Sequence, residues 1–474
     1  MKQNILLCTD SYYYSHFLQY PPGTTSMYAY LESRGGRYDE IVFFGLQYII
    51  KEYLSKPFTR ADIEEAADIA LLHGVPFNRE EFEYILNNYN GYFPVTIKAL
   101  PEGTIAPVKV PMVTIEPLVE DRKTYWCVGF IQSLILQVWY PITVATNSRE
   151  IKKVIKQYLE ETGDVSGLPF KLHDFGLRGT SSMESGAIGG MAHLAVGWKG
   201  TDTMPALLAA RRYYNEKIAG FSIPAAEHST ITSWLRENET EAYRNMIRQF
   251  SKEDSIYAVV SDSYDLMNAV ENIWGGELKD EVIASKGILV VRPDSGDPVA
   301  TPIKVVEKLA EKFGTTTNSK GYKVLNNVRV IQGDGIEIDT IRSICIGLKL
   351  KGFSIDNIAF GMGGALLQIV NRDDQKFAIK CSAIKVNNVW RDVFKDPITD
   401  PGKRSKAGRV TTRRKADGTL YASVVGWSDK GIEDPIALES VYELGIAQEF
   451  ESATWKVPYI REQSFADIRQ RAEV

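Results

Sequence analysis

The chain has 474 residues, of which 44% are hydrophobic and 24% charged, and its formal net charge is −5. A chain of this length exceeds the roughly 250–300 residues at which one hydrophobic core stops growing, so we expect at least two domains. The composition excludes a largely disordered chain, and the near balance of acidic and basic residues excludes a global basic field that would hold nucleic acid.

The N-terminal segment lacks the apolar core of a signal peptide, because Thr9 and Asp10 interrupt its few apolar residues. The most apolar later stretch, residues 130–146, is broken by Gln, Ser and Pro well short of a membrane span. The four cysteines are widely spaced and form no Cys-x-x-Cys pair, which argues against a zinc cage or a disulfide framework. We therefore expect a cytoplasmic protein that does not cross a membrane.

Residues 1–145 are predicted to form a β-rich region that also contains helices. The segment 59–74 predicts a helix that Thr59 or Asp62 caps and Gly74 ends. Between residues 92 and 117, Val and Ile alternate with polar residues between Pro and Gly turns. This alternation is typical of half-buried antiparallel strands.

From about residue 168 to residue 370 the pattern changes to short apolar strands, each followed by a helix-like stretch. Near-continuous Val, Ile and Leu runs spaced one βα unit apart indicate parallel strands covered by helices, and this many in series predict a barrel. Seven segments are candidates for the ends of these strands: 170–176, 200–203, 221–229, 257–263, 288–296, 328–335 and 357–364.

After about residue 380 the βα rhythm ends, a basic run covers residues 403–415, and the segment TLYASVVGW predicts a strand. The basic run is by default a solvated loop, although in an acidic protein it would also suit a polyphosphate. We predict an α/β fold with a barrel-like parallel domain at 146–380. A second, discontinuous β-rich domain is predicted from residues 1–145 and 381–474.

Charged residues gather at the predicted strand ends, where barrel enzymes carry their chemistry. Helix caps and turns would explain many of the acidic residues, but they explain Arg178, Arg292 and His228 poorly. The residues concerned are Asp174, Arg178, Asp202, Glu227, His228, Asp262, Arg292, Asp294 and Asp334.

His228 stands beside Glu227 at a predicted strand-to-helix junction, where a proton or phosphoryl acceptor would be exposed and oriented. His173, beside Asp174, is ambiguous, and the remaining three histidines have weaker contexts and are more readily structural. Arg292 and Asp294 flank Pro293 and would serve a ligand or form a structural ion pair.

Two glycine-rich turns, QGDG at 332–335 and GMGG at 361–364, each follow a β run and precede a helix. Such turns let backbone N–H groups and a helix N-terminus approach a phosphate, and the last two barrel strands commonly supply this site. Tight packing is the alternative explanation. An aromatic cluster near the N-terminus, which includes Tyr12, suits either a core or the stacking of a flat heteroaromatic ring.

Many of these segments occur together, in the same order, in one enzyme family. They include TDSYYYSHFLQYPPGT, VWYPITVATNSRE, KLHDFGLRGTSS, KGTDT, PAAEHSTIT, RPDSG, VIQGDG and FKDPITDPGKRSKAGR. From about residue 4 to nearly the C-terminus, the chain resembles the nicotinamide phosphoribosyltransferases of the type II phosphoribosyltransferase family.

The resemblance implies a homodimer whose subunits share each active site, with nicotinamide, phosphoribosyl pyrophosphate and ATP as substrates. Phe175 and Tyr12 of the partner subunit would sandwich the pyridine ring, and Arg178 and Arg292 would line the ring and ribose region. Asp202 would accept a hydrogen bond from the carboxamide, whereas the carboxylate of nicotinate would face a like charge there.

The resemblance also assigns the remaining subsites. Asp294 would bind the ribose hydroxyls. The 5-phosphate would lie among Gly333, Asp334, Gly363, Gly364 and Arg372. Pyrophosphate or ATP phosphates would meet Arg34, Lys380, Lys395 and Arg409. Mg²⁺ would enter with the pyrophosphate, so no protein ligand to the metal is assigned.

By the same resemblance, ATP would transiently phosphorylate His228, with Glu227 and Asp262 nearby, and so drive mononucleotide formation. Two alternatives stay open. A nicotinate phosphoribosyltransferase would share the fold but should lack an anion that faces the carboxylate, whereas Asp202 is present. A non-catalytic nicotinamide-binding or signalling protein should have lost His228, Arg292 or Asp294, and all three are present.

Overall fold

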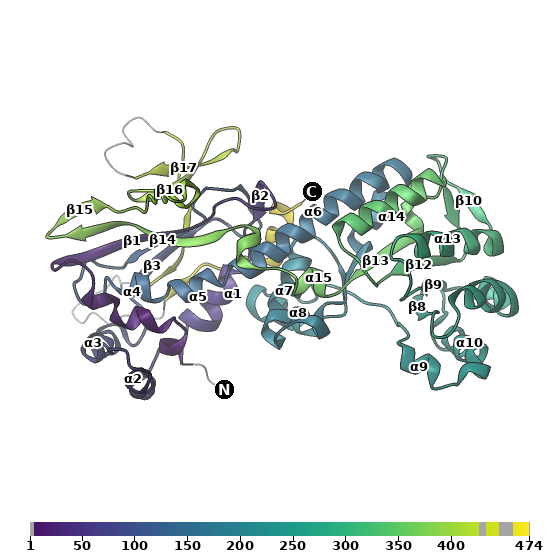
Figure 1. Cartoon of the computed structure of the whole chain (residues 1–474), viewed down its shortest axis with the longest axis horizontal. Helices are drawn as coiled ribbons and strands as arrows, with labels where there is room; N and C mark the ends of the chain where they lie inside the picture. The colour runs from purple at the N-terminus through teal and green to yellow at the C-terminus, as the bar shows by residue number, and fades with distance from the viewer. Residues whose placement is uncertain (1–3, 426–432, 445–457, 474) are drawn as a thin grey trace. The chain divides into compact units, whose positions relative to one another are not determined.

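The computed structural model describes residues 4–425, 433–444 and 458–473. Its contacts divide the chain into two compact units (Figure 1). Unit 1 comprises Met1–Thr146, Tyr213–Asn215 and Asn371–Ala472. Unit 2 comprises Asn147–Arg212, Glu216–Val370 and Glu473–Val474. Both ends of the chain therefore contribute to unit 1, and the middle of the chain forms most of unit 2.

Unit 1 is built on a seven-stranded antiparallel sheet with the order β15-β14-β1-β5-β3-β18-β19. Its two longest strands, β1 (Thr24–Ser33) and β14 (Phe377–Val386), run side by side (Figure 1). The others are β3 (Val95–Ala99), β5 (Val113–Pro117), β15 (Val389–Asp392), β18 (Glu439–Glu443) and β19 (Tyr459–Ile460). The antiparallel strands expected between residues 92 and 117 are confirmed.

Two small ribbons and several helices complete unit 1. The ribbons pair β2 (Glu40–Val42) with β4 (Ile105–Pro107) and β16 (Val410–Arg414) with β17 (Leu420–Val424). The predicted helix at 59–74 is α2 (Arg60–His73), with a Thr59–Asp62 capping box and Gly74 at φ 87°. The other helices are α1 (Leu46–Ile49), α3 (Arg79–Tyr89), α4 (Cys127–Phe130), α5 (Gln132–Leu136) and α16 (Phe465–Arg471).

A buried carboxylate joins three distant stretches of unit 1. Glu102 accepts hydrogen bonds from the Tyr214 hydroxyl at 2.8 Å and from the Gln47 backbone at 2.6 Å. Arg471 donates to the Glu102 carbonyl at 2.6 Å. Burial raises the pKa of Glu102, and these hydrogen bonds to the carboxylate oppose that shift. Tyr214 comes from the short Tyr213–Asn215 stretch, which is thereby tied to unit 1.

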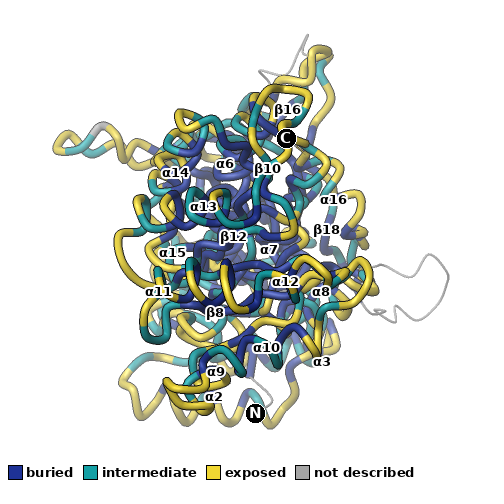
Figure 2. The backbone as a smooth tube through the Cα atoms, turned by 90° about the vertical axis from the view of Figure 1, so that its right-hand side faces the viewer, coloured by how far each residue is buried: buried dark blue, intermediate teal, exposed yellow. Residues whose placement is uncertain are grey.

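Unit 2 is built on a six-stranded parallel sheet with the order β7-β6-β13-β12-β9-β8. The strands are almost wholly buried, as their apolar runs predicted (Figure 2). Their bounds are β6 (Leu172–Asp174), β7 (Gly200–Thr201), β8 (Ile256–Val260), β9 (Ile288–Arg292), β12 (Val328–Gln332) and β13 (Ile358–Met362).

Of the seven predicted strands, the one expected in 221–229 is not a strand but links the two edges of this sheet. Phe221 bridges to Gly200 in β7, and Ala225 bridges to Ala258 in β8, both in the parallel sense. Between the bridges stands Pro224, which has no N–H and can only accept, from Ala258 N at 2.9 Å. The sheet therefore curls toward closure, as expected of a barrel-like domain.

Helices cover the outside of the parallel sheet; α13 packs beside β12, and α14 packs beside α13 (Figure 1). A small hairpin pairs β10 (Thr315–Thr317) with β11 (Lys323–Leu325). The helices are α6 (Trp139–Thr162), α7 (Met183–Ala195), α8 (Met204–Tyr214), α9 (His228–Thr232), α10 (Glu239–Phe250), α11 (Leu266–Asn268), α12 (Lys279–Ala284), α13 (Ala300–Phe313), α14 (Ile338–Leu350) and α15 (Gly364–Leu367).

The helical run Cys127–Thr162 has the length and composition to cross a membrane, with a mean hydropathy of 1.5 in its most apolar window. However, 67% of that window is buried inside the protein. Buried apolar helices are ordinary components of globular cores. The run is therefore weak evidence for a membrane span.

A buried lysine lies at the amino-terminal end of the parallel strands. Lys171, directly before β6, donates from Nζ to the carbonyls of Ile355, Asp356 and Ile358, each at 3.0 Å. Burial lowers the pKa of Lys171 to about 8, because the charged ammonium is removed from water.

Candidate active site

The carboxyl ends of the parallel strands meet at one edge of the unit 2 sheet. The ladders align Met362 with Asp174, Asp174 with Thr201, and Val260 with Arg292. The charged residues that follow these strands are therefore brought to the same edge, as the sequence predicted. In barrels this edge carries the chemistry.

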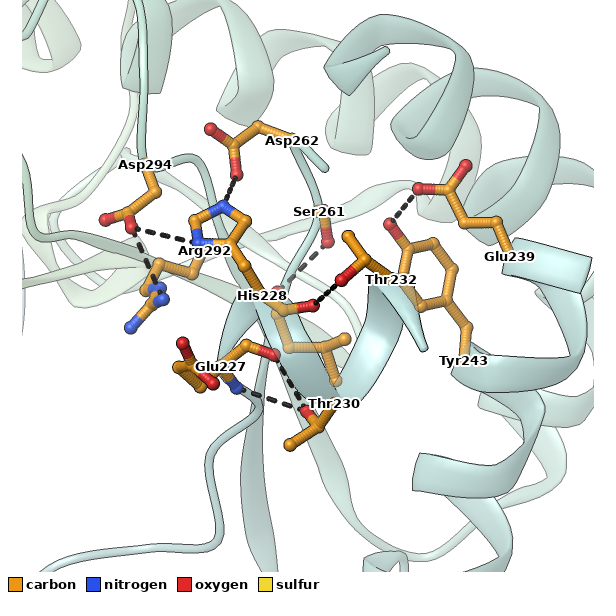
Figure 3. Close-up of polar contacts among 11 residues, drawn as sticks. Glu227, His228, Thr230, Thr232, Glu239, Tyr243, Ser261, Asp262, Arg292 and Asp294 are labelled. Atoms are coloured by element: carbon orange, nitrogen blue, oxygen red, sulfur yellow. Dashed lines mark hydrogen bonds and ion pairs between the residues drawn. The ribbon is translucent and has the colours of Figure 1, made fainter. Parts of the chain in front are cut away.

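His228 is held between two carboxylates at this edge (Figure 3). Its Nε2 lies 2.9 Å from Asp262 Oδ1, and its Nδ1 lies 3.9 Å from Asp294 Oδ2. Arg292 donates from Nη2 to Asp294 Oδ2 at 3.4 Å. The imidazole side chain is 42% exposed, so the ring is oriented and still open to a reactant. Such an arrangement suits a nucleophile or a proton acceptor.

Glu227 caps the helix that His228 begins. In a capping box it pairs with Thr230, and its carboxylate also accepts a hydrogen bond from the Ser229 hydroxyl. The Ser229 hydrogen bond lowers the pKa of Glu227. The Glu227 carboxylate thus fixes where α9 begins. It thereby positions His228, the first residue of that helix, as N-terminal caps generally do.

Phe175 lies against the backbone of the two glycine-rich turns. A Cβ atom at Gly361 would fall 1.9 Å from Phe175 Cε2, and one at Gly333 would lie 3.4 Å from the same atom. Gly361 is therefore required by packing, which confirms the packing explanation for this one glycine. The Phe175 ring at the end of β6 is therefore held in place by the backbone of β13 and by the backbone that follows β12.

The later glycines of the second turn border open space. A Cβ atom at Gly364 would meet nothing within 4 Å, and one at Gly363 only the Phe175 carbonyl at 4.0 Å. In the first turn, at 332–335, Asp334 is exposed, and Gln332 donates from Nε2 to the Asp334 carbonyl at 2.9 Å. The space beside these turns is therefore free for a ligand such as a phosphate.

Asp202 follows β7 and is held by hydrogen bonds at both its backbone and its side chain. Its N–H donates to the Asp174 carbonyl at 3.0 Å. Its Oδ1 lies 3.0 Å from His173 Nε2 and accepts from the Ser222 hydroxyl at 2.5 Å. Burial alone would raise the pKa of Asp202, but the hydrogen bond and charge of His173, with Ser222, lower it overall. Asp202 is therefore an ionised acceptor.

The sequence left His173 ambiguous and gave no role to Ser222. The signal for His173 was its place one residue before the strand-end Asp174, two residues from Phe175. Nothing in the local pattern pointed to Ser222, because its contact with Asp202 depends on the closing segment 221–226.

Asp174 is buried and organises the strand ends around it. It accepts from Gly176 N at 2.8 Å and from the Thr201 hydroxyl at 3.1 Å. Burial raises its pKa, against the effect of these hydrogen bonds. Arg178, in the 3-10 helix Leu177–Gly179, is exposed, and its charge lies close enough to Glu227 to favour the ionised carboxylate.

Unit 1 contains a second candidate region, a pocket of about 490 Å³ with strongly basic walls. Among the described residues that line it, Asp10 is the only acid. Tyr12 also lines it and is 54% exposed. The basic residues are Arg34, Arg372, Lys380, Lys395 and Lys403. Such a pocket is built for a polyanion.

The positively charged side chains that line this pocket repel one another. Burial lowers the pKa of Lys380, and the charges of Arg34, Lys395 and Arg372 lower it further. A bound anion would relieve this repulsion. Lys403, from the basic run, joins the pocket although the resemblance did not assign it. Arg409 is not among the described lining residues, and its guanidinium lies 5.1 Å from the Trp390 ring centroid instead.

Over residues 4–425, 433–444 and 458–473, no group of three or more His, Cys, Asp or Glu side chains is arranged to hold a metal ion. Asp262 and Asp294 beside His228 provide carboxylate oxygens, the donor type that Mg²⁺ prefers. Mg²⁺ is usually bound by one or two carboxylates together with substrate phosphates. These residues fit a Mg²⁺ ion that arrives with a phosphate-bearing substrate.

Comparisons with known proteins agree on one family. The model of the nicotinate phosphoribosyltransferase family matches residues 170–428, and that of the nicotinamide phosphoribosyltransferase N-terminal domain matches residues 4–97. A nicotinamide phosphoribosyltransferase from Xanthomonas campestris is 52% identical, over 89% of this chain and 90% of that protein. Another from Acinetobacter baylyi is 32% identical, over 93% and 94%.

Solved structures agree on the fold. A nicotinate-nucleotide pyrophosphorylase from Pyrococcus furiosus superposes with a TM-score of 0.61 at 15% identity, over 99% of this chain and 95% of that one. Human nicotinic acid phosphoribosyltransferase gives a TM-score of 0.55 at 14% identity, over 98% and 92%. At these identities the likeness concerns the fold alone.

Proposed function

Because this chain belongs to the nicotinate phosphoribosyltransferase family, we propose that it transfers phosphoribose from phosphoribosyl pyrophosphate to nicotinamide. The products are nicotinamide mononucleotide and pyrophosphate, a step of NAD salvage. The observation that carries the choice of nicotinamide is Asp202, an ionised acceptor within the same strand-end edge as Phe175. The names of the relatives from Xanthomonas and Acinetobacter support the same acceptor.

Nicotinamide would stack on Phe175 and point its carboxamide at Asp202. Tyr12 of the partner subunit would cover the other face of the ring, with Arg178 and Arg292 along its edge. The neutral amide offers N–H donors to the Asp202 carboxylate, whereas nicotinate would bring a second negative charge to it. The pocket therefore discriminates by charge.

Phosphoribosyl pyrophosphate would lie along the remaining strand ends. Asp294 would accept hydrogen bonds from the ribose hydroxyls, and Gly333, Asp334, Gly363 and Gly364 would surround the 5-phosphate together with Arg372. The open space at Gly364 is the feature that supports this placement. The pyrophosphate would meet Arg34, Lys380 and Lys395, and Arg409 remains a proposal from the resemblance alone.

The reaction joins the pyridine nitrogen to C1 of the ribose while the bond from C1 to the pyrophosphate oxygen breaks. The ring nitrogen carries no proton, so no general base is needed, and its electron pair becomes the new bond. Positive charge develops on the sugar, and pyrophosphate leaves with the bonding electrons. Arg and Lys side chains orient and neutralise the leaving group. Mg²⁺ bound to the pyrophosphate supplies further neutralisation.

ATP would be coupled through His228. Because Asp262 holds Nε2, the Nδ1 lone pair is the free nucleophile and would take the γ-phosphoryl group as ADP leaves. Hydrolysis of the N–P bond by water then returns the free imidazole and inorganic phosphate. Glu227 would act by fixing the start of α9. A homodimer in the cytoplasm, with shared active sites, completes the proposal.

Product formation tests the proposal directly. The full-length protein is incubated with phosphoribosyl pyrophosphate and Mg²⁺, with nicotinamide or nicotinate, each with and without ATP. Nicotinamide mononucleotide as the dominant product, in higher yield with ATP, is expected. Preference for nicotinate would identify the alternative enzyme, and no product from either pyridine would favour a non-catalytic binding protein.

A further inference from the structure

Two donors converge on a single oxygen of Asp202. His173 Nε2 lies 3.0 Å from Oδ1, and the Ser222 hydroxyl donates to the same atom at 2.5 Å. A carboxylate has two oxygens that accept hydrogen bonds. Neither of these contacts uses Oδ2, and the Asp202 side chain is 49% exposed. One oxygen is thus held within the protein while the carboxylate stays open to a ligand.

The hydroxyl of Ser222 is directed at Asp202 rather than elsewhere. A hydroxyl has one hydrogen to donate, and the other acceptor within reach, the Ile223 carbonyl, lies 3.5 Å away. Ser222 follows Phe221, whose N–H and carbonyl are both bonded across the bridge, to Lys199 at 2.7 Å and Thr201 at 3.0 Å. The closing segment therefore sets where this hydroxyl points.

The backbone of Asp202 is fixed as well. Its N–H is bonded to Asp174, and its carbonyl accepts from Met204 N at 3.0 Å. With the backbone and Oδ1 both held, rotation of the carboxylate is the remaining freedom, and two donors on one oxygen oppose that rotation. The plane of the carboxylate is then set before a ligand arrives, which is the condition for a directional hydrogen bond to a planar carboxamide.

We propose that Ser222 is a specificity-determining positioning residue, which with His173 occupies Oδ1 of Asp202 so that Oδ2 alone is presented to the carboxamide N–H of the acceptor. This inference rests on the proposed function and adds a residue to its acceptor pocket. The role differs from that of Asp202, because removal of the Ser222 hydroxyl leaves the negative charge in place. Rejection of nicotinate should therefore survive while recognition of the amide weakens.

The test compares Ser222→Ala with the wild-type protein. The KM for nicotinamide should rise about tenfold with little change in kcat. The reason is that the hydrogen bond from Ser222 to Asp202 orients the carboxylate that binds the acceptor equally in the ground state and in the transition state. The low kcat/KM for nicotinate should change less than about twofold. Ser222→Thr, which keeps a hydroxyl, should restore most of the affinity. Ser166→Ala is the matched control, because Ser166 donates to Asp164 at 2.7 Å, away from the strand ends.

A parallel loss of kcat/KM for both pyridines would overturn the inference and make Ser222 a merely structural residue, as would unchanged kinetics. Titration calorimetry with nicotinamide separates this outcome from failure of the proposed function. A wild-type protein that binds nicotinamide but forms no mononucleotide overturns the proposed function. Equal Kd values for wild type and Ser222→Ala overturn the role of Ser222, and absence of nicotinamide binding by the wild type overturns both.

Discussion

The imidazole Nε2 of His228 lies 2.9 Å from Oδ1 of Asp262, which follows β8. In the proposed phosphorylation of His228 this contact leaves Nδ1 as the nucleophile, so Asp262→Ala should let the ring turn and reduce the stimulation of mononucleotide formation by ATP roughly tenfold or more. His228→Ala should abolish the stimulation and the acid-labile phosphate on the protein. The measurement is the ratio of rates with and without ATP.

Thr232→Ala is the control for that experiment. Its hydroxyl donates to the His228 carbonyl at 3.0 Å and does not touch the ring. This variant should keep the stimulation by ATP. Full stimulation in His228→Ala would contradict the phosphohistidine.

Asp202→Asn should narrow the preference for nicotinamide over nicotinate. The substitution removes the negative charge that repels nicotinate. It also replaces a carboxylate that only accepts hydrogen bonds with an amide that carries donors of its own, which weakens binding of the carboxamide N–H. The ratio of the two kcat/KM values should fall by about tenfold or more. An unchanged ratio would remove Asp202 from substrate choice.

Gly361→Ala and Gly364→Ala should separate the two uses of glycine in the second turn. The added methyl group at Gly361 meets the Phe175 ring, so we expect overpacking of about 1–3 kcal/mol, a lower Tm and a higher KM for nicotinamide. Gly364→Ala should fold normally, because the methyl enters open space, but raise the KM for phosphoribosyl pyrophosphate. Identical defects in both variants would contradict this division.

Lys380→Met should weaken the binding of pyrophosphate about tenfold, measured by calorimetry, since a charged hydrogen bond contributes roughly 1.5–3 kcal/mol. Lys385→Met, on the same strand, is the control. Lys385 is paired with Glu120 at 2.6 Å and is not among the described residues that line the basic pocket. Equal pyrophosphate affinity in wild type and Lys380→Met would remove Lys380 from the anion site.

Lys171 should give stability a distinct dependence on pH. Its pKa is about 8 in the folded protein against 10.5 ordinarily, so the unfolded chain binds more protons between these values. The cost of burying the charge is fully present below about pH 8, and stability rises as the pH approaches 10.5. The free energy of unfolding of wild type relative to Lys171→Met should therefore increase across this window.

Lys320→Met controls for the loss of carbonyl contacts, because Lys320 is exposed yet donates to the carbonyls of Glu160 and Gly163, each at 2.7 Å. Denaturant unfolding at several pH values provides the comparison. A difference between wild type and Lys171→Met that stays constant from pH 8 to 10 would contradict the lowered pKa.

Local sequence patterns predicted the elements that local physics determines. Thr59, Asp62 and Gly74 bound a helix through caps whose partners lie within a few residues. The strand-end residues of unit 2 could be predicted to meet because parallel strands place their carboxyl ends at one edge. The segment with Pro224 was the exception, since its apolar composition did not reveal that it would make only isolated bridges.

Contacts between distant segments were beyond such reasoning. The bond from Ser222 to Asp202 depends on how the closing segment lies across the sheet edge. The basic pocket depends on the pairing of Tyr30 with Lys380, which brings residues after β1 and within β14 together. No local pattern distinguishes Lys403, which lines that pocket, from Arg409, which does not.

The bond between Tyr214 and Glu102 has a consequence for how such chains can recombine. Tyr214 is encoded in the middle of the gene, between segments of the parallel-sheet unit, yet its hydroxyl satisfies a buried carboxylate of the antiparallel unit. A chimera that took the whole continuous stretch 147–370 from a second parent would pair Glu102 with a foreign residue at position 214. Exchange of that stretch between relatives should therefore preserve folding only when residues 213–215 stay with unit 1 or already match.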